Sequence, residues 1–216
     1  VPDRRHGDDP GTNPERVEVF KIKRADPVAP GKPAPDVLMD FNQAARICGL
    51  GEIGKGSFFL TPRFGPFQRF AFVLTDAELE PDPMSEATLC DQCGQCAAAC
   101  PGKAISLSGE LDEWQCAAYR MGADLATNPF LDPDAAKAMP DGAAVLAGDK
   151  RFDEESLEQW KALLDEAYPR VCSGYNPALC GLACQRACLA HLEEKDVLDD
   201  KFINKFRTCE PWKLAV

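Results

Sequence analysis

Residues 90–101 read CDQCGQCAAACP, in which four cysteines follow the spacing Cys-x2-Cys-x2-Cys-x3-Cys and a proline comes directly after the last one. Iron–sulfur cubanes are held on a single loop by this spacing. Three thiolates at intervals of three converge on three irons of one [4Fe–4S] cluster, whereas the fourth, before the proline, points to a second cluster. The motif therefore predicts electron-transfer chemistry and requires further ligands downstream in the chain.

A second group of cysteines follows much later in the chain. Residues 180–188, CGLACQRAC, place Cys180, Cys184 and Cys188 at intervals of four, and Cys116 stands alone between the two groups. We expect the remaining cluster ligands among these residues. Cys172 competes by its spacing with Cys188 for the last ligand position, so both alternatives stay open.

Other uses of cysteine explain less of the pattern. A disulfide scaffold is typical of a small secreted chain, whereas this chain has 216 residues, 45% hydrophobic composition and an odd number of cysteines, 11. Zinc sites usually combine two Cys-x2-Cys pairs or mix cysteine with histidine, and both His6 and His191 are distant in sequence from the first loop. Isolated cysteines such as Cys48 and Cys209 can be structural, because a free thiol packs as a small hydrophobe.

The charge of the chain restricts its partners. Its net charge is −11, whereas nucleic acids and anionic membrane surfaces bind basic patches, so we expect neither as a partner. We expect instead a redox protein or subunit that donates or accepts electrons within a larger complex. Residues 75–86, TDAELEPDPMSE, carry five carboxylates and are either a docking surface or a solvated connector.

The sequence also bears on localisation. It has no apolar run of 18 residues or more, so we expect no membrane span. The first residues, VPDRRHGDDP, lack the apolar region of a signal peptide. Because thiolate-bound clusters suit a reducing compartment, we expect a cytoplasmic location.

We expect three segments along the chain. Residues 1–36 contain seven prolines and predict an extended arm or linker. Residues 37–85 predict an α/β segment, with a helix from Val37 that carries one apolar face and a strand in which Phe70, Phe72 and Leu74 alternate. The expected helix face consists of Leu38, Phe41, Ala45 and Cys48, and Gly49 ends the helix. Residues 86–216 carry both cysteine groups.

Gly49, Gly51 and Gly54 match the G-x-G-x-x-G fingerprint of dinucleotide-binding sites. That fingerprint requires a preceding strand, so that the next helix points its N-terminus at the pyrophosphate. Here a helix is predicted before it. We therefore expect no nucleotide at Gly49–Gly56. The glycines either allow close packing of this loop against the protein or a flat cofactor, or form a purely structural turn.

After the first cysteine loop, GKAISL predicts a short strand and WQCAAYRM begins a helix with Cys116. Residues 127–151 are loop-like, with an alanine-rich interruption. Residues 152–169 predict an amphipathic helix with Asp153 as N-cap and Pro169 at its end. Its apolar stripe consists of Leu157, Trp160, Leu163, Leu164 and Ala167. The tail supplies Phe202, Phe206 and Trp212 for packing. The expected fold class is α+β, a ferredoxin-like two-cluster module on a partial α/β segment, with a helical insertion at about 120–170.

The order of these segments resembles a known family. AARICGLGEIGKGSFFLTPRFGP, FVLTDAELEPD, CDQCGQCAAACPGKAIS and WQCAAYR, followed by a second cysteine group, are similar to the C-terminal half of epoxyqueuosine reductases and corrinoid-dependent reductive dehalogenases. The resemblance covers residues 36–120 well and 172–192 loosely. In that family two [4Fe–4S] clusters in a ferredoxin-like module supply electrons to a cobalamin.

The resemblance implies a ligand set for each cluster. One cluster would be bound by Cys90, Cys93, Cys96 and Cys188, and the other by Cys100, Cys116, Cys180 and Cys184. The implied function is electron transfer to a corrinoid reductase site. The alternative is an electron-relay subunit of another oxidoreductase complex, without its own active site. No catalytic residue is identified, because no nucleophile, acid/base pair or cobalt ligand stands out.

Overall fold

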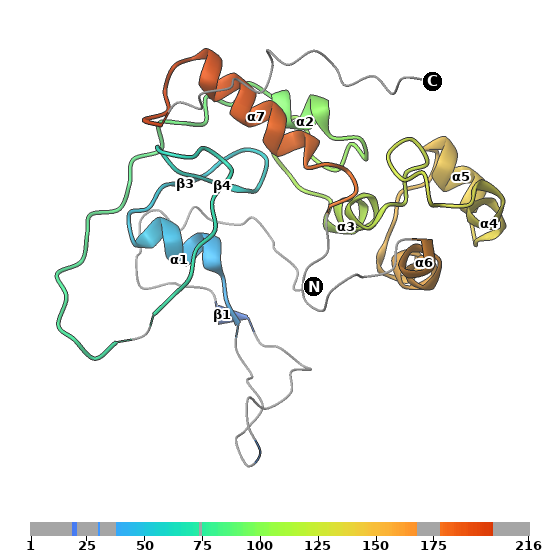
Figure 1. Cartoon of the computed structure of the whole chain (residues 1–216), viewed down its shortest axis with the longest axis horizontal. Helices are drawn as coiled ribbons and strands as arrows, with labels where there is room; N and C mark the ends of the chain where they lie inside the picture. The colour runs from blue at the N-terminus through green and yellow to red at the C-terminus, as the bar shows by residue number, and fades with distance from the viewer. Residues whose placement is uncertain (1–18, 21–29, 31–37, 74, 168–177, 201–216) are drawn as a thin grey trace, which may run out of the picture.

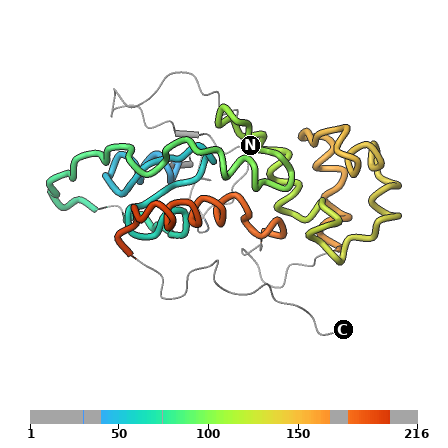
Figure 2. Tube along the Cα trace, turned by 90° about the horizontal axis from the view of Figure 1, so that it is seen from above, coloured from blue at the N-terminus to red at the C-terminus, as the bar shows by residue number. Residues whose placement is uncertain are grey.

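The computed structural model describes residues 19–20, 30, 38–73, 75–167 and 178–200. These residues form helices and two small two-stranded sheets. α1, β3 and β4 lie at one end of the molecule and α4, α5 and α6 at the other, with α2 and α7 between them (Figure 1). The same division is visible after a 90° turn (Figure 2). The expected arm at 1–36 and the tail residues Phe202, Phe206 and Trp212 lie almost wholly outside the described residues.

Both sheets are antiparallel. β1 (Val19–Phe20) pairs with β2 (Leu38–Met39), and β3 (Glu52–Ile53) pairs with β4 (Phe59–Leu60) so that Glu52 faces Leu60. The Gly49–Gly56 loop thus enters a hairpin after a helix. The helix predicted before this loop is present, where the dinucleotide fingerprint requires a strand.

The first helix begins later than predicted. α1 spans Phe41–Ile47, because the Asp40 carboxylate accepts hydrogen bonds from the backbone N–H groups of Asn42 (2.9 Å) and Gln43 (3.2 Å) and so caps the helix there. Leu38 belongs to β2 instead. Of the predicted apolar face Ala45 is buried, whereas Phe41 and Cys48 are exposed.

The strand predicted around Phe70 does not form among the described residues. Residues 69–73 belong to neither a helix nor a strand, and Leu74 lies outside the described residues. The alternation has another cause. The Phe70 ring packs edge-on against Phe59 at 5.0 Å between centroids, and the Phe72 ring packs against Phe41 at 4.9 Å.

The segment after the first cysteine loop also has less strand than predicted. Ile105 and Leu111 form one isolated antiparallel bridge in place of the expected GKAISL strand. The predicted helix with Cys116 is confirmed as α3 (Glu113–Met121). The loop expected at 127–151 contains α4 (Pro133–Ala138) and α5 (Gly142–Ala147), which pack against each other.

The amphipathic helix is confirmed as α6 (Glu154–Ala167). The Asp153 carboxylate accepts the Ser156 N–H at 2.8 Å, as an N-cap does. Leu157, Trp160 and Leu164 are buried in a core with residues of α3, α4 and α5. Trp160 is fully buried, and its ring meets Phe152 edge-on at 5.2 Å between centroids.

Gln115 ties this helical core to the first cysteine loop. Its buried side chain donates to the Gly102 carbonyl at 3.1 Å and accepts the Phe152 N–H at 2.9 Å. Arg151 adds an exposed ion pair to Asp112 at 2.7 Å and donates to the Lys103 carbonyl at 3.1 Å. The turn after Cys100 is therefore anchored on α3 and on the start of α6.

None of the helices in the described part of the chain is long and apolar enough to cross a membrane.

Replacement of Trp160 tests this core. Trp160→Ala should lower the free energy of unfolding by about 3–5 kcal/mol, because it opens a cavity among fully buried side chains. Chemical denaturation followed by circular dichroism measures the change. Leu107→Ala, at a side chain that is 77% exposed, is the control and should stay within about 0.5 kcal/mol of the parent. A small effect of Trp160→Ala would contradict the proposed packing.

Candidate metal centre

The first cysteine loop is shaped by two residues with left-handed backbone. Gln92 has φ 63° and Gly94 has φ 78°, so the chain turns sharply between Cys90 and the start of α2 (Gln95–Ala99). Cys96 lies in the first turn of α2 and Cys100 follows its last residue in extended backbone. The loop therefore distributes its thiols around one short helix.

A buried carboxylate holds the start of this loop. Glu52, on β3, is 4% exposed, and its two oxygens accept three consecutive backbone N–H groups. Thr88 donates at 2.5 Å, Leu89 at 3.0 Å and Cys90 at 2.7 Å. Hydrogen bonds to an ionised acceptor are stronger than neutral ones, and they satisfy a charge that would be costly to bury alone.

Backbone amides also reach the sulfurs. The Lys55 N–H donates to Cys90 Sγ at 3.3 Å, and the Ala104 N–H donates to Cys100 Sγ at 3.3 Å. Such bonds stabilise thiolates and are among the factors that set cluster potentials. The Gly-rich hairpin thus supplies both Glu52 and Lys55 to the first cysteine loop.

The second cysteine motif lies on a turn and on α7 (Ala183–Glu194). Cys184 and Cys188 are one helical turn apart and so share a face, and Cys180 precedes the helix. α7 packs along α2 (Figure 1). Cys116 comes from α3, to which the start of this segment is tied by the Leu179 N–H bonded to the Arg120 carbonyl at 3.0 Å.

The described thiols fall into two neighbourhoods. Burial first, and then the thiols of Cys96, Cys90 and Cys93, raise the pKa of Cys188 to about 12. We call these four residues the first thiol group. It contains both Cys96, which is buried, and Cys93, which is exposed.

The second neighbourhood adjoins the first, because the Cys184 thiol also raises the pKa of Cys188. Burial, followed by the thiols of Cys100, Cys180 and Cys116, raises the pKa of Cys184 to about 12. Burial and then Cys100 and Cys180 raise the pKa of Cys116. We call these four residues the second thiol group. Both groups combine cysteines from the first loop with cysteines from the second motif.

The donor sets suit an iron–sulfur cluster. Thiols that raise one another's pKa are stable together as thiolates only when a metal supplies positive charge among them. Around them are apolar side chains. Phe58 packs against two apolar clusters. Cys90 and Cys188 also pack against the first, and the second includes Cys96 and is contacted by Cys100 and Cys184.

The other three cysteines are Cys48, Cys172 and Cys209. Cys48 is exposed at the end of α1, and it is not among the groups that raise the pKa of Cys96, Cys116, Cys184 or Cys188. Cys172, the predicted competitor of Cys188, and Cys209 lie outside the described residues.

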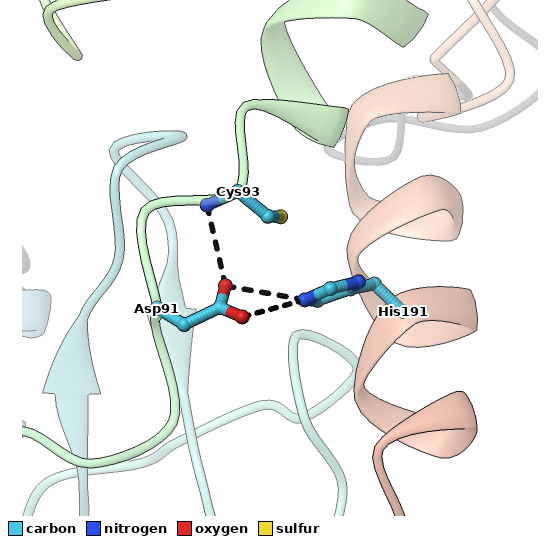
Figure 3. A group of neighbouring side chains, drawn as sticks. All are labelled: Asp91, Cys93 and His191. Atoms are coloured by element: carbon cyan, nitrogen blue, oxygen red, sulfur yellow. Dashed lines mark hydrogen bonds and ion pairs between the residues drawn. The ribbon is translucent and has the colours of Figure 1, made fainter.

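A polar cluster lies beside the first thiol group (Figure 3). The Asp91 carboxylate accepts the Cys93 N–H at 3.2 Å, faces His191 Nε2 at 2.9 Å and pairs with the Lys195 ammonium. Hydrogen bonds from Lys195 and then His191 hold the pKa of the Asp91 carboxyl well below its ordinary value. The cluster connects the cysteine loop to the last turns of α7.

The glycine loop packs against this chain's own atoms. A Cβ on Gly51 would lie 2.0 Å from the Leu60 carbonyl oxygen, and one on Gly49 would lie 2.4 Å from that of Pro83. A Cβ on Gly56 would lie 2.1 Å from the Phe58 ring. Close backbone packing, one of the alternatives left open by the sequence, therefore accounts for these glycines, and their faces are not open to a flat cofactor.

The acidic segment lies largely in solvent. Residues 75–86 are mostly exposed and without helix or strand. Ser85 donates to the Gly49 carbonyl at 2.5 Å and so attaches the end of this segment to the glycine loop. Its exposed carboxylates remain compatible with either a docking surface or a solvated connector.

Sequence comparison finds local similarity to reductases. The chain is 46% identical over 61 residues to the tetrachloroethene reductive dehalogenase of Desulfitobacterium hafniense, which covers 27% of this chain and 11% of that protein. It is 29% identical over 117 residues to the epoxyqueuosine reductase of Listeria monocytogenes, which covers 54% of this chain and 29% of that protein. The tetrachloroethene reductive dehalogenase of Sulfurospirillum multivorans is 38% identical over 61 residues, which covers 27% of this chain and 12% of that protein.

The chain thus spans less than a third of the length of each of these relatives. No family model matches the sequence, and no solved structure gives a significant match. The similarity supports an oxidoreductase-type role.

Glu52 offers a direct test of the site. Glu52→Gln should lower the free energy of unfolding of the metal-loaded protein by about 2 kcal/mol, because a neutral amide replaces an ionised acceptor of three buried N–H groups. Denaturant titration measures the loss, and iron release during the titration should begin earlier. Glu80→Gln, at an exposed carboxylate, should change neither quantity. Equal behaviour of the two variants would contradict the role of Glu52.

Proposed function

We propose that this chain relays single electrons through two [4Fe–4S] clusters to a reductase centre. The observation that supports the proposal is the set of thiols that raise one another's pKa: Cys90, Cys93 and Cys96 act on Cys188, whereas Cys100, Cys116 and Cys180 act on Cys184. Each group draws on both cysteine motifs, as the spacing at 90–101 requires. When bound, each cluster would accept and release one electron at a time.

The first cluster would be held by the first thiol group: Cys90, Cys93, Cys96 and Cys188. The second would be held by the second thiol group: Cys100, Cys116, Cys180 and Cys184. The backbone N–H of Lys55 would donate to Cys90 Sγ in the first group, and that of Ala104 would donate to Cys100 Sγ in the second. Phe58 packs against two apolar clusters that cysteines of both groups also contact, and it would help to exclude water there.

The two groups are also neighbours. Cys184 and Cys188 are one turn apart on α7, and Cys96 and Cys100 lie at the start and just past the end of α2. Because α2 and α7 pack together, the clusters would lie side by side, which favours electron transfer from one to the other.

The electron acceptor we propose is a corrinoid, as the resemblance to reductive dehalogenases and epoxyqueuosine reductases implies. A second candidate is a relay subunit whose reductase centre is on another protein. The covered glycine faces at Gly49–Gly56 favour this candidate, since they offer no open surface for a corrinoid there. Cobalamin titration of the metal-loaded protein, followed by absorption spectroscopy, separates the two. In both cases we propose a reducing compartment, the cytoplasm, and a redox partner.

Iron analysis with paired variants tests the relay. Anaerobically prepared protein should contain about eight irons and eight sulfides per chain, because the ligand set matches two cubanes. Cys188→Ser should lose the first cluster, about four irons, and retain the second. Cys172→Ser is the matched control and should retain both.

Paramagnetic resonance of the reduced proteins identifies which cluster remains. Stoichiometric zinc or about four irons in the parent protein would contradict the two-cluster proposal. Loss of a cluster in Cys172→Ser but not in Cys188→Ser would show that the ligand assignment is wrong.

A further inference from the structure

Cys93 differs from the other members of the first thiol group in its surroundings. It is exposed, whereas Cys96 is buried and both Cys90 and Cys188 are half-buried. The thiolate at Cys93 would therefore be the ligand most open to solvent and oxidants, since accessible thiolates are oxidised most readily. The iron bound by Cys93 would be the iron most easily lost.

Two other potential ligands lie beside Cys93. One donor atom each from Asp91, Cys93 and His191 are all within 4.8 Å of one another. The three side chains converge on one space between the cysteine loop and α7 (Figure 3). Carboxylate, thiolate and imidazole are all ligands that bind iron in proteins.

The hydrogen bonds of the cluster single out Asp91. His191 Nε2 faces the carboxylate at 2.9 Å from Oδ2 and 3.1 Å from Oδ1, so this nitrogen is engaged with Asp91. The carboxylate is fixed further by the Lys195 ammonium and by the Cys93 N–H. A carboxylate has about four lone-pair sites, so one oxygen can bind a metal while the other keeps a hydrogen bond.

We propose that Asp91 is a reserve ligand for the iron that Cys93 binds. When the Cys93 thiolate takes up a proton from solvent and leaves the iron as a neutral thiol, the bond from iron to sulfur would break, a bond from iron to an Asp91 oxygen would form, and the cluster would keep four irons. One monoanionic ligand replaces another, so the exchange needs no electron and leaves the charge of the cluster with its ligands unchanged. His191 and Lys195 are positioning residues for this carboxylate. The inference rests on the proposed function.

Removal of the thiol from Cys93 tests the exchange. Cys93→Ala should retain a first cluster with about four irons, whereas Cys93→Ala with Asp91→Asn should retain about three. Iron analysis, Mössbauer spectroscopy and the resonance signal of an oxidised [3Fe–4S] cluster distinguish the two. The second cluster is an internal standard in every variant.

Cys96→Ala is the matched control. Cys96 is 6% exposed and packs among apolar side chains. Among the described residues, the group of potential metal ligands that contains Asp91 includes Cys93 but not Cys96. This variant should lose iron from the first cluster although Asp91 is present. A [3Fe–4S] signal already in Cys93→Ala, or four irons retained in the double variant, would overturn the inference while the proposed function stands.

A second measurement applies if Cys93→Ala takes up no cluster. Asp91→Asn, with all cysteines present, should convert the first cluster to the [3Fe–4S] form several-fold faster than the parent protein during limited exposure to air. An unchanged rate overturns the inference alone. A parent protein without [4Fe–4S] signals would instead overturn the proposed function, and this inference with it.

Discussion

The buried Glu52 carboxylate is the interaction on which the arrangement around the first cysteine loop depends. It accepts the N–H groups of Thr88, Leu89 and Cys90 and so fixes the backbone where that loop begins. The same hairpin donates the Lys55 N–H to Cys90 Sγ. A hairpin whose strands are only two residues long has little stability by itself. The hydrogen bonds of Glu52 therefore stabilise both the hairpin and the start of the cysteine loop.

The two cysteine motifs are joined by the packing of α2 on α7. Each thiol group takes members from both sides of this helix pair, so neither group can form until segments about ninety residues apart in sequence have come together. A metal cluster bound at such a site contributes its binding free energy to folding. The helices α3 to α6 add a separate apolar core, which Gln115 and Arg151 attach to the turn after Cys100.

The sequence predicted what local spacing controls and missed what depends on distant contacts. The loop at 90–101, the helix with Cys116 and the stripe with Trp160 follow from short-range patterns. The prediction of a strand at Phe70 was wrong, because the alternating phenylalanines pack against other aromatic rings and do not belong to a β-ladder. Glu52 was missed altogether. An acid between glycines gives no sign that three amides some thirty-six residues later will surround it. The ligand set of each cluster came from a family resemblance and not from spacing, and it stays a prediction.

The central claim is that two cubanes lie side by side, bound by cysteines that cross between the motifs. Electron paramagnetic resonance of the fully reduced protein tests it most directly. Two neighbouring reduced [4Fe–4S] clusters interact magnetically, so the account predicts a broadened, split spectrum that simplifies when only one cluster is reduced. A spectrum that is the plain sum of two isolated clusters, or that of a single cluster, would contradict it.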